Sequence, residues 1–172
     1  SGGVANGVAE YSVATVTNSK DGDHPSTATL QLESKAGLQW KNVNPGAQYN
    51  FYAVYPYIDP SSVESYLFEI SVDQNSAKTE TSLGGYEASD LLFAKAESVS
   101  RADSKVSLKF KHMMSKCIVN VVKGPKFEGE LPDDIAVHIY NTVTTADLNL
   151  ANGSIEKYAL GNRNTITMKK VA

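Results

Sequence analysis

The stretch SKVSLKFKHMMSKCIVNVVKG, residues 104–124, contains two runs of alternating apolar residues separated by HMMSK, residues 112–116. Alternation with a period of two is typical of a β-strand that is buried on one face. The inward side chains have even numbers before the interruption and odd numbers after it: Val106, Leu108, Phe110, Cys117, Val119 and Val121. A continuous flat strand cannot change parity in this way, because a one-residue slip exchanges its two faces. We therefore expect two core strands joined by a tight turn, a single helical turn or a bulge.

Short alternating runs recur along the rest of the chain, bounded by Gly, Pro, Asn, Asp and Ser. Helical periodicity is hard to find, and the longest polar stretch, residues 73–89, is a candidate functional loop. About nine to eleven strands with little helix predict an all-β fold, built as an antiparallel β-sandwich. The expected strands lie at residues 10–17, 27–34, 48–57, 65–72, 90–96, 106–112, 116–124, 134–143 and 166–170, with a hairpin through Asn152-Gly153.

Length and charge limit the possible functions. The chain has 172 residues, which suits one domain spanning residues 1–172. Its formal net charge is −3 and its 16 basic residues form no run, which argues against nucleic-acid binding. No stretch approaches the ~18 to 20 apolar residues that a membrane-spanning helix needs. The sequence begins without an initiating methionine, and we expect a precursor segment upstream of Ser1.

The residues that could carry catalysis or bind a metal are few. His24, His112 and His138 lie far apart in sequence, and no spacing of His and Cys residues suits a local zinc site. Cys117, the single cysteine, could be a nucleophile with His112 as its base, or a core residue. Its alternation with Val119 and Val121 favours core packing. We expect no catalytic, metal-binding or cofactor-binding residues, no cofactor, and no enzymatic activity.

Three other features each have a structural and a functional interpretation. Asn152-Gly153-Ser154 is a glycosylation sequon, but a hairpin turn explains the same residues. Asp133 and Asp134 are adjacent, so in an extended chain they point to opposite faces and cannot jointly flank a bond. An aromatic group could stack on sugars if it is exposed, although strand alternation places most of it in the core: Tyr49, Phe51, Tyr52, Tyr55 and Tyr57.

Three segments together resemble a known family. They are AVYPY at residues 53–57, SDLLFAKA at residues 89–96 and the strand pair at residues 106–122, with a hairpin region at residues 146–154 downstream. This combination resembles the fimbrillin family, the subunits and anchors of surface fimbriae in certain Gram-negative bacteria, over roughly residues 48–170. The residues that carry the motifs are Asp90, Leu91, Leu92, Phe110, His112, Ser115 and Lys116.

The resemblance implies an N-terminal-type domain with a transthyretin-like β-sandwich fold. It also implies a lipoprotein precursor that crosses the periplasm to the outer membrane, and a fimbrial location at the cell surface. Subunits of the family assemble by strand exchange: a first strand is removed and an extended segment of a neighbouring subunit fills the groove, which supplies partners for unpaired edge groups. If the first strand here is the exchangeable one, its buried side is Tyr11, Val13 and Thr15.

The sequence departs from the family pattern in two ways. Family subunits usually carry a second sandwich domain, for which 172 residues leave no room, so we expect a fragment, a short member or a tip or anchor relative. The first arginine is Arg101, so processing after an arginine near the N-terminus is not supported. The expected partners are other fimbrial subunits. The alternative is a surface-anchored module that binds a glycan or a host or bacterial surface protein through residues 73–89 and exposed tyrosines, without polymerising.

Overall fold

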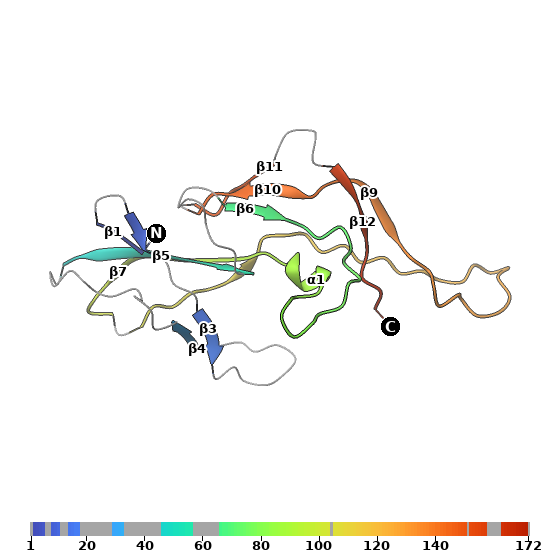
Figure 1. Cartoon of the computed structure of the whole chain (residues 1–172), viewed down its shortest axis with the longest axis horizontal. Helices are drawn as coiled ribbons and strands as arrows, with labels where there is room; N and C mark the ends of the chain where they lie inside the picture. Colours follow the sequence, from blue (N-terminus) through green and yellow to red (C-terminus); the bar gives the residue numbers. More distant parts are fainter. Residues whose placement is uncertain are drawn as a thin grey trace. The chain divides into compact units, whose positions relative to one another are not determined.

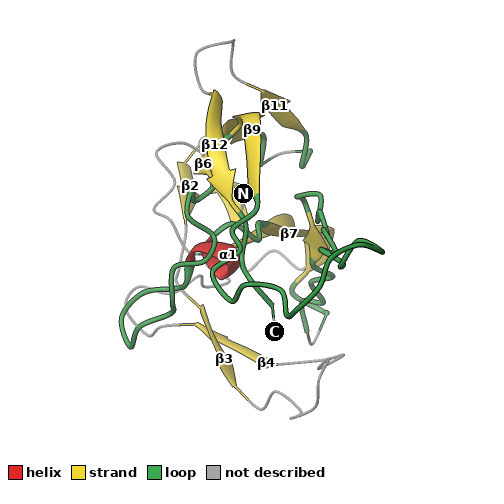
Figure 2. Cartoon of the chain, turned by 90° about the vertical axis from the view of Figure 1, so that its right-hand side faces the viewer, coloured by secondary structure: helices red, strands yellow, loops and turns green. Residues whose placement is uncertain are grey.

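The structure is a computed structural model, and it describes residues 2–5, 8–10, 14–17, 29–32, 46–56, 66–103, 105–150, 152–157 and 163–171. Strands that pair in antiparallel sheets dominate these residues, with one short helix, so the expected all-β fold is confirmed (Figure 2). The transthyretin-like sandwich arrangement and the number of strands in the whole chain stay predictions.

The sheets each contain two or three strands. Their strand orders are β1-β2, β3-β4, β5-β7-β8, β11-β10-β6 and β12-β9 (Figure 1). The elements are β1 (Gly2–Ala5), β2 (Val8–Glu10), β3 (Ala14–Thr17), β4 (Thr29–Leu32), β5 (Gln48–Tyr55), β6 (Tyr66–Glu69), α1 (Gly85–Ala88), β7 (Leu92–Ser100), β8 (Lys111–His112), β9 (His138–Val143), β10 (Thr145–Leu148), β11 (Ile155–Lys157) and β12 (Arg163–Thr167).

The chain divides into two compact units. One contains Ser1–Ala53 and Ala94–Phe110, and the other contains Val54–Phe93 and Lys111–Ala172. The single domain expected from the sequence stays a prediction.

The first unit contains two strand pairs near the N-terminus. β1 pairs with β2 from Gly2↔Glu10 to Ala5↔Val8, and β3 pairs with β4 from Ala14↔Leu32 to Thr17↔Thr29. The β3-β4 pair confirms strands within two of the expected ranges, residues 10–17 and 27–34. In the same unit the backbone N–H of Ser98 donates to Asn50 Oδ1 at 3.0 Å, which joins β7 to β5 through a side chain.

In the second unit, β6 shows the alternation expected from its sequence. Tyr66 and Phe68 are each 2% exposed, whereas Leu67 and Glu69 point to solvent. β10 pairs with β6 and adds Leu148 to the buried residues. The strand expected at residues 65–72 ends earlier, at Glu69, and Val72 beyond it is exposed. The alternation therefore holds only as far as the strand has a pairing partner.

The hairpin expected at Asn152-Gly153 connects β10 and β11, which pair from Ala146↔Lys157 to Leu148↔Ile155. Gly153 has φ +74° and its N–H donates to Asn149 O at 2.8 Å. Asn152 has no positive φ, so the connection is longer than a two-residue type I′ turn, which requires positive φ at both central residues. A Cβ on Gly153 would lie 2.7 Å from the Phe93 ring, so this glycine also permits close packing.

The β9-β12 pair runs from Arg163↔Val143 to Thr167↔His138 and places Ile166 among the buried residues. At the end of β12, Thr167 N donates to Val72 O at 2.7 Å and Gln74 N donates to Thr167 O at 2.9 Å. These two bonds attach the start of the 73–89 segment to β12.

The two core strands expected within residues 104–124 are largely absent. Only Lys111 and His112 form a strand, β8, and residues 113–137 have no strand. Figure 1 shows this segment leaving the strands and returning to β9. The positions Phe110, Cys117 and Val119, expected to be buried, are exposed, and none of the strands that the structure describes pairs with them.

Candidate assembly surface

The family motifs meet at a junction between the start of β7 and β8. Leu92 pairs with His112, and Met113 N donates to Leu91 O at 2.8 Å. His112 Nδ1 lies 2.7 Å from Asp90 Oδ1, and since an ionised carboxylate can only accept, Nδ1 is the donor. Leu91 beneath this pair is 1% exposed. The structure thus brings together Asp90, Leu91, Leu92 and His112, and the structural role expected of His112 stays a prediction.

The helix α1 lies beside this junction and presents an aromatic ring to two lysines. Lys169 Nζ is 5.1 Å and Lys116 Nζ is 5.9 Å from the ring centroid of Tyr86, distances at which an ammonium group is attracted to the ring face. Lys116 is one of the family motif residues, and this contact links the end of the HMMSK interruption to α1. Ser115 and Phe110, the remaining motif residues, are exposed.

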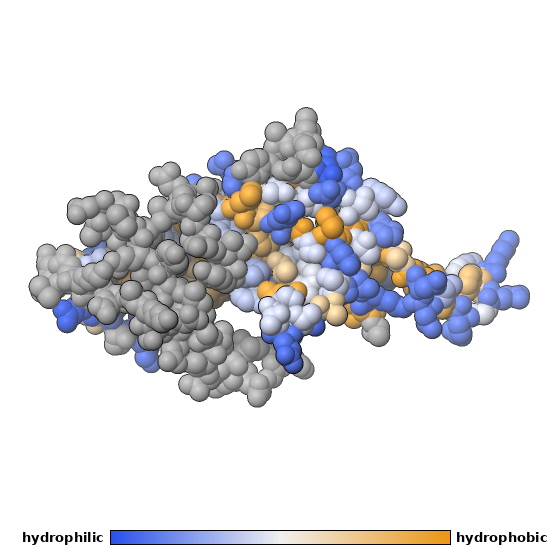
Figure 3. Space-filling model, viewed as in Figure 1, coloured by the Kyte–Doolittle hydropathy of each residue, from blue (hydrophilic) through white to orange (hydrophobic). Residues whose placement is uncertain are grey.

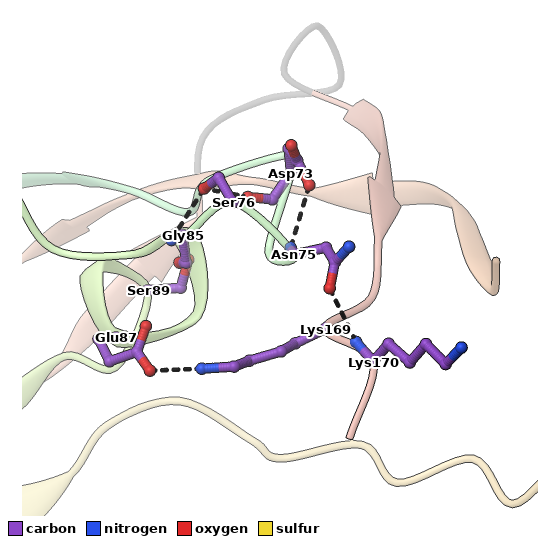
Figure 4. A network of polar contacts seen from close by, with 8 residues as sticks. All are labelled: Asp73, Asn75, Ser76, Gly85, Glu87, Ser89, Lys169 and Lys170. Atoms are coloured by element: carbon purple, nitrogen blue, oxygen red, sulfur yellow. Dashed lines mark hydrogen bonds and ion pairs between the residues drawn. The ribbon is translucent and has the colours of Figure 1, made fainter. Parts of the chain in front are cut away.

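Hydrogen bonds hold residues 73–89 against the C-terminal segment. Ser76 Oγ donates to Asp73 O and accepts from Gly85 N, both at 3.0 Å, and Ser89 Oγ donates to Gly85 O at 2.7 Å. Figure 4 shows Glu87 and Asn75 facing the residues that follow β12. Lys169 Nζ donates to Glu87 Oε1 at 2.5 Å, and Lys170 N donates to Asn75 Oδ1 at 3.2 Å. Residues 73–89, the candidate functional loop, are thus held by hydrogen bonds among themselves and to Lys169 and Lys170.

The charges around α1 affect two ionisable groups. The hydrogen bond from Lys169 lowers the pKa of the Glu87 carboxyl below its ordinary value. Burial raises the pKa of the Tyr55 hydroxyl, with smaller contributions from the negative charges of Asp90 and Glu87. Both shifts stabilise the ordinary protonation state of these groups at neutral pH, the carboxylate of Glu87 and the neutral hydroxyl of Tyr55.

The principal surface feature of the second unit is an uncovered apolar segment. We call residues 117–122, CIVNVV, the apolar stretch. Ile118 and Val122 are 71% and 78% exposed, and Val119 and Val121 are 47% and 46% exposed. Within the described part of the chain, no backbone hydrogen bond involves these residues. Figure 3 shows apolar and charged residues side by side on this segment, at the right of the view.

The apolar stretch belongs to an excursion that turns back on itself. Phe127 N donates to Gly124 O at 2.9 Å at the turn, and Lys123 Nζ binds Glu130 Oε2 at 3.0 Å between the outgoing and returning arms. Lys170 Nζ also donates to Asp133 O on the returning arm. These contacts lie at the base and the tip of the excursion, and none of them involves residues 117–122.

Cys117 is exposed, so its expected place in the core is wrong. The alternative pairing with His112 finds no support, because His112 is bonded to Asp90 and no contact joins it to Cys117 among the described residues. Cys117, the first residue of the apolar stretch, therefore carries an accessible thiol.

The structure describes most of the other candidate sites, namely the histidines and the aromatic group. Within the described ranges no cluster of His, Cys, Asp and Glu could hold a metal ion, and no helix is long and apolar enough to cross a membrane. His138 Nδ1 lies 3.1 Å from Thr167 Oγ1, and His24 falls outside the described residues. Of the aromatic group, Tyr49, Phe51 and Tyr52 are half-buried and Tyr55 is 42% exposed. Tyr57 lies outside the described residues.

Two of the three residues of the candidate exchangeable strand are not described by the structure. Tyr11 and Val13 lie outside the described residues. Thr15 lies in β3, where its backbone pairs with Gln31 of β4. The role proposed for these three residues stays a prediction.

Sequence reasoning missed the contact between α1 and the C-terminal segment. Glu87 and Lys169 are 82 positions apart, and neither belongs to a recognisable motif. The sequence offered one signal: Glu87 and the lysine pair at residues 169–170 carry opposite charges. Opposite charges alone do not predict which residues are in contact.

Comparison with known proteins gives the family. The model of a family described as fimbrillin-like matches residues 5–172, nearly the whole chain. The chain belongs to the fimbrillin-like family. This confirms the resemblance read from the motif residues, several of which the fold brings into contact. A comparison with curated proteins found no match.

Two solved structures share the fold of this fimbrillin-like chain. Each is described as a "putative cell adhesion protein", one from Bacteroides uniformis and one from Bacteroides ovatus. The first is 20% identical with a TM-score of 0.51, over 83% of this chain and 53% of the other. The second is 19% identical with a TM-score of 0.51, over 92% of this chain and 63% of the other. The fimbrillin-like chain thus spans less than two thirds of either relative.

Proposed function

We propose that this fimbrillin-like protein is a structural or adhesive subunit, or an accessory domain, of bacterial surface fimbriae, and that it assembles by strand exchange. Its place is the cell surface, in a fimbrium attached to the outer membrane, with a lipid anchor on a precursor segment. The role is adhesion and assembly, and it requires no cofactor and no catalysis. Family membership and the cell-adhesion description of the structural relatives support this role.

The apolar stretch is the observation that carries strand exchange. Its six residues include Ile118, Val119, Val121 and Val122, whose β-branched side chains favour extended pairing. An apolar segment that no described strand pairs with can accept another strand, because a partner satisfies the backbone groups and covers the side chains. A neighbouring subunit that supplies such a strand would link the two chains without any covalent bond.

The proposal is tested by assembly in cells that express the full-length precursor with its partner subunits. We expect ladders that survive mild heating on denaturing gels. The variant V119D/V121D should lose them, because a buried unpaired carboxylate in the exchanged strand is costly. L67D is the matched control, since Leu67 is 53% exposed on β6, outside the apolar stretch. Absence of ladders from the wild-type chain, or ladders unchanged in V119D/V121D, would contradict the proposal.

A second candidate function is a surface-anchored module that binds a glycan or a surface protein without polymerising. Tyr140 favours it, because this side chain is 72% exposed on β9, and its ring centroid is 6.3 Å from that of His138. An exposed tyrosine offers a flat apolar face and a polar tip to a sugar. Glycan-array binding that disappears in Y140A, in a wild-type chain that forms no ladders, would favour this function. An array without hits would exclude it.

A further inference from the structure

We infer that the outward face of the β9-β12 pair binds a sugar that carries a carboxylate group. This inference rests on the glycan-binding function proposed above and names the ligand class of the surface around Tyr140. It does not depend on whether the chain polymerises. Three observations support it: the groups gathered on one face of the pair, the β-bulge that presents them, and the charges of the two strands.

The register of the pair places five polar side chains on its outward face. Ile166 of β12 is paired with Ile139 of β9 and is 6% exposed, so these two side chains lie on the inward face. Successive side chains of a strand alternate between its faces, and Figure 2 shows the two strands side by side. The outward residues are therefore His138, Tyr140, Arg163, Thr165 and Thr167.

A β-bulge lies at the centre of this face. The register shifts within the pair, so that Tyr140 and Asn141 of β9 lie opposite Thr165 alone. Asn141 has φ +59°, a left-handed conformation that is uncommon for residues other than glycine. Bulges change the direction of side chains, and both bulges and such backbone outliers are frequent at functional sites. The bulge thus distinguishes this face from a regular strand pair.

The exposed groups on this face suit a sugar ring. Tyr140 is 72% exposed, and its ring centroid is 6.3 Å from that of His138. An aromatic ring can stack on the apolar C–H face of a sugar, and hydroxyl and imidazole groups can bond to the sugar's hydroxyls. Thr165 is exposed beside Tyr140. Among the described residues, His138 bonds through Nδ1 to Thr167 Oγ1, and its Nε2 has no hydrogen bond.

The charges of the two strands favour an anionic ligand. β9 and β12 contain Arg163 and no aspartate or glutamate, although the whole chain has a formal net charge of −3. The acidic residues nearest to β9 in the sequence, Asp134 and Asp147, lie four positions before it and four positions after it. The positive charge of Arg163 is therefore not balanced within the pair.

Arg163 is placed to bind a carboxylate. Its Nη1 donates to Asn141 O at 2.8 Å, which holds the guanidinium beside the bulge. Among the described residues, Arg163 forms no ion pair, and the guanidinium has further N–H donors. A guanidinium binds a carboxylate through two parallel hydrogen bonds. A sugar whose ring stacks on Tyr140 can therefore place its carboxylate at Arg163.

An acidic peptide is the main competitor, because it also carries carboxylates. The outward face offers one guanidinium, whereas its other groups are aromatic rings and hydroxyls. A peptide with several carboxylates would find a single partner for them. A sugar ring with one carboxylate uses the ring, the hydroxyls and the guanidinium together, so this face favours the sugar.

The test compares acidic sugars with their methyl esters, because esterification removes the charge and leaves the sugar ring and its hydroxyls in place. The full chain is applied to an array of sialylated and hexuronate-containing oligosaccharides, their methyl esters, neutral oligosaccharides and a glutamate tripeptide. We expect binding to at least one acidic oligosaccharide and about tenfold weaker binding to its methyl ester. High salt should reduce this difference.

Substitutions of Arg163 and Tyr140 separate the contributions of charge and stacking. R163Q should lose the preference for the acid over the ester, and R163K should keep only part of it, because an ammonium group cannot form the bidentate pair. R101Q is the matched control, since it removes the other arginine of the chain, which is exposed in the turn after β7. Y140A should abolish binding of both sugars. Circular dichroism verifies that each variant is folded.

Several outcomes would overturn the inference. They are equal binding of an acidic sugar and its methyl ester, an unchanged preference in R163Q, and equally tight binding of the glutamate tripeptide. If only neutral sugars bind, and Y140A abolishes that binding, the glycan-binding function stands and the carboxylate is wrong. If no sugar binds, both fail, and ladder formation tests the fimbrial role separately.

Discussion

At the scale of single residues, Gly153 is required for two reasons, its positive φ and its close approach to the Phe93 ring. Its φ of +74° is strained for any residue with a Cβ, and the Phe93 ring leaves no space for one. The sequence predicted the turn from Asn152-Gly153, but it could not predict the packing against Phe93, because that contact is set by the tertiary fold.

Replacing Gly153 by Ala should lower the free energy of unfolding by about 2 to 3 kcal/mol, from the strained backbone and the displaced ring together. Chemical denaturation measures the change. G129A separates the two contributions, because Gly129 has φ +91° but an added Cβ would meet nothing within 4 Å. It should cost about 1 kcal/mol. Equal losses in the two variants would show that the Phe93 contact contributes nothing.

Replacing His112 by Gln should mainly alter stability, and only by about 0.5 kcal/mol. The side chain is 71% exposed, and among the described residues its side-chain interaction is the bond to Asp90. K111Q, at the neighbouring exposed position of β8, is the control. Denaturation midpoints and ladder formation are the measurements. Loss of assembly at unchanged stability would show that His112 acts in the function directly.

At the scale of elements, alternation was reliable where a strand found a neighbour and unreliable where it did not. The pattern in residues 66–69 matched β6, because β10 lies beside it. The same kind of pattern in residues 117–122 predicted a buried strand, yet the segment is open. Periodicity states which side chains share a face once the chain is extended. It does not state whether another strand of the same chain packs against that face. The exposure of the apolar stretch could therefore not be predicted from the sequence alone.

The contact between α1 and the C-terminal segment should make stability depend on pH. Glu87 has a lowered pKa in the folded chain, so its contribution is present above the ordinary value of 4.5 and is lost as pH falls through the lower folded value. E87Q should therefore be less stable than wild type well above pH 4.5 and approach it below. The effect should be small and decrease with salt, because the pair is partly exposed. A stability difference that does not change with pH would contradict this origin.

At the scale of the whole molecule, β5 and β7 each begin in one compact unit and end in the other. Unfolding of either unit would break strands that also belong to its neighbour. We therefore expect a single cooperative transition, with near-UV and far-UV circular dichroism changing together. Separated transitions would show two independently folding domains, contrary to the single domain predicted from the sequence.

The exposed backbone of the apolar stretch also determines where proteases can cleave the chain before it assembles. Proteases bind substrates as extended strands, and cleavage concentrates where backbone is exposed. A lysine-directed protease should therefore cut at Lys116, Lys123 or Lys126 sooner than at Lys95 or Lys111, which lie in the paired strands β7 and β8. Occupation by a neighbour's strand would close these sites. Resistance to digestion would thus distinguish subunits inside a fimbrium from free ones, and an unpartnered subunit would be short-lived wherever such proteases are present.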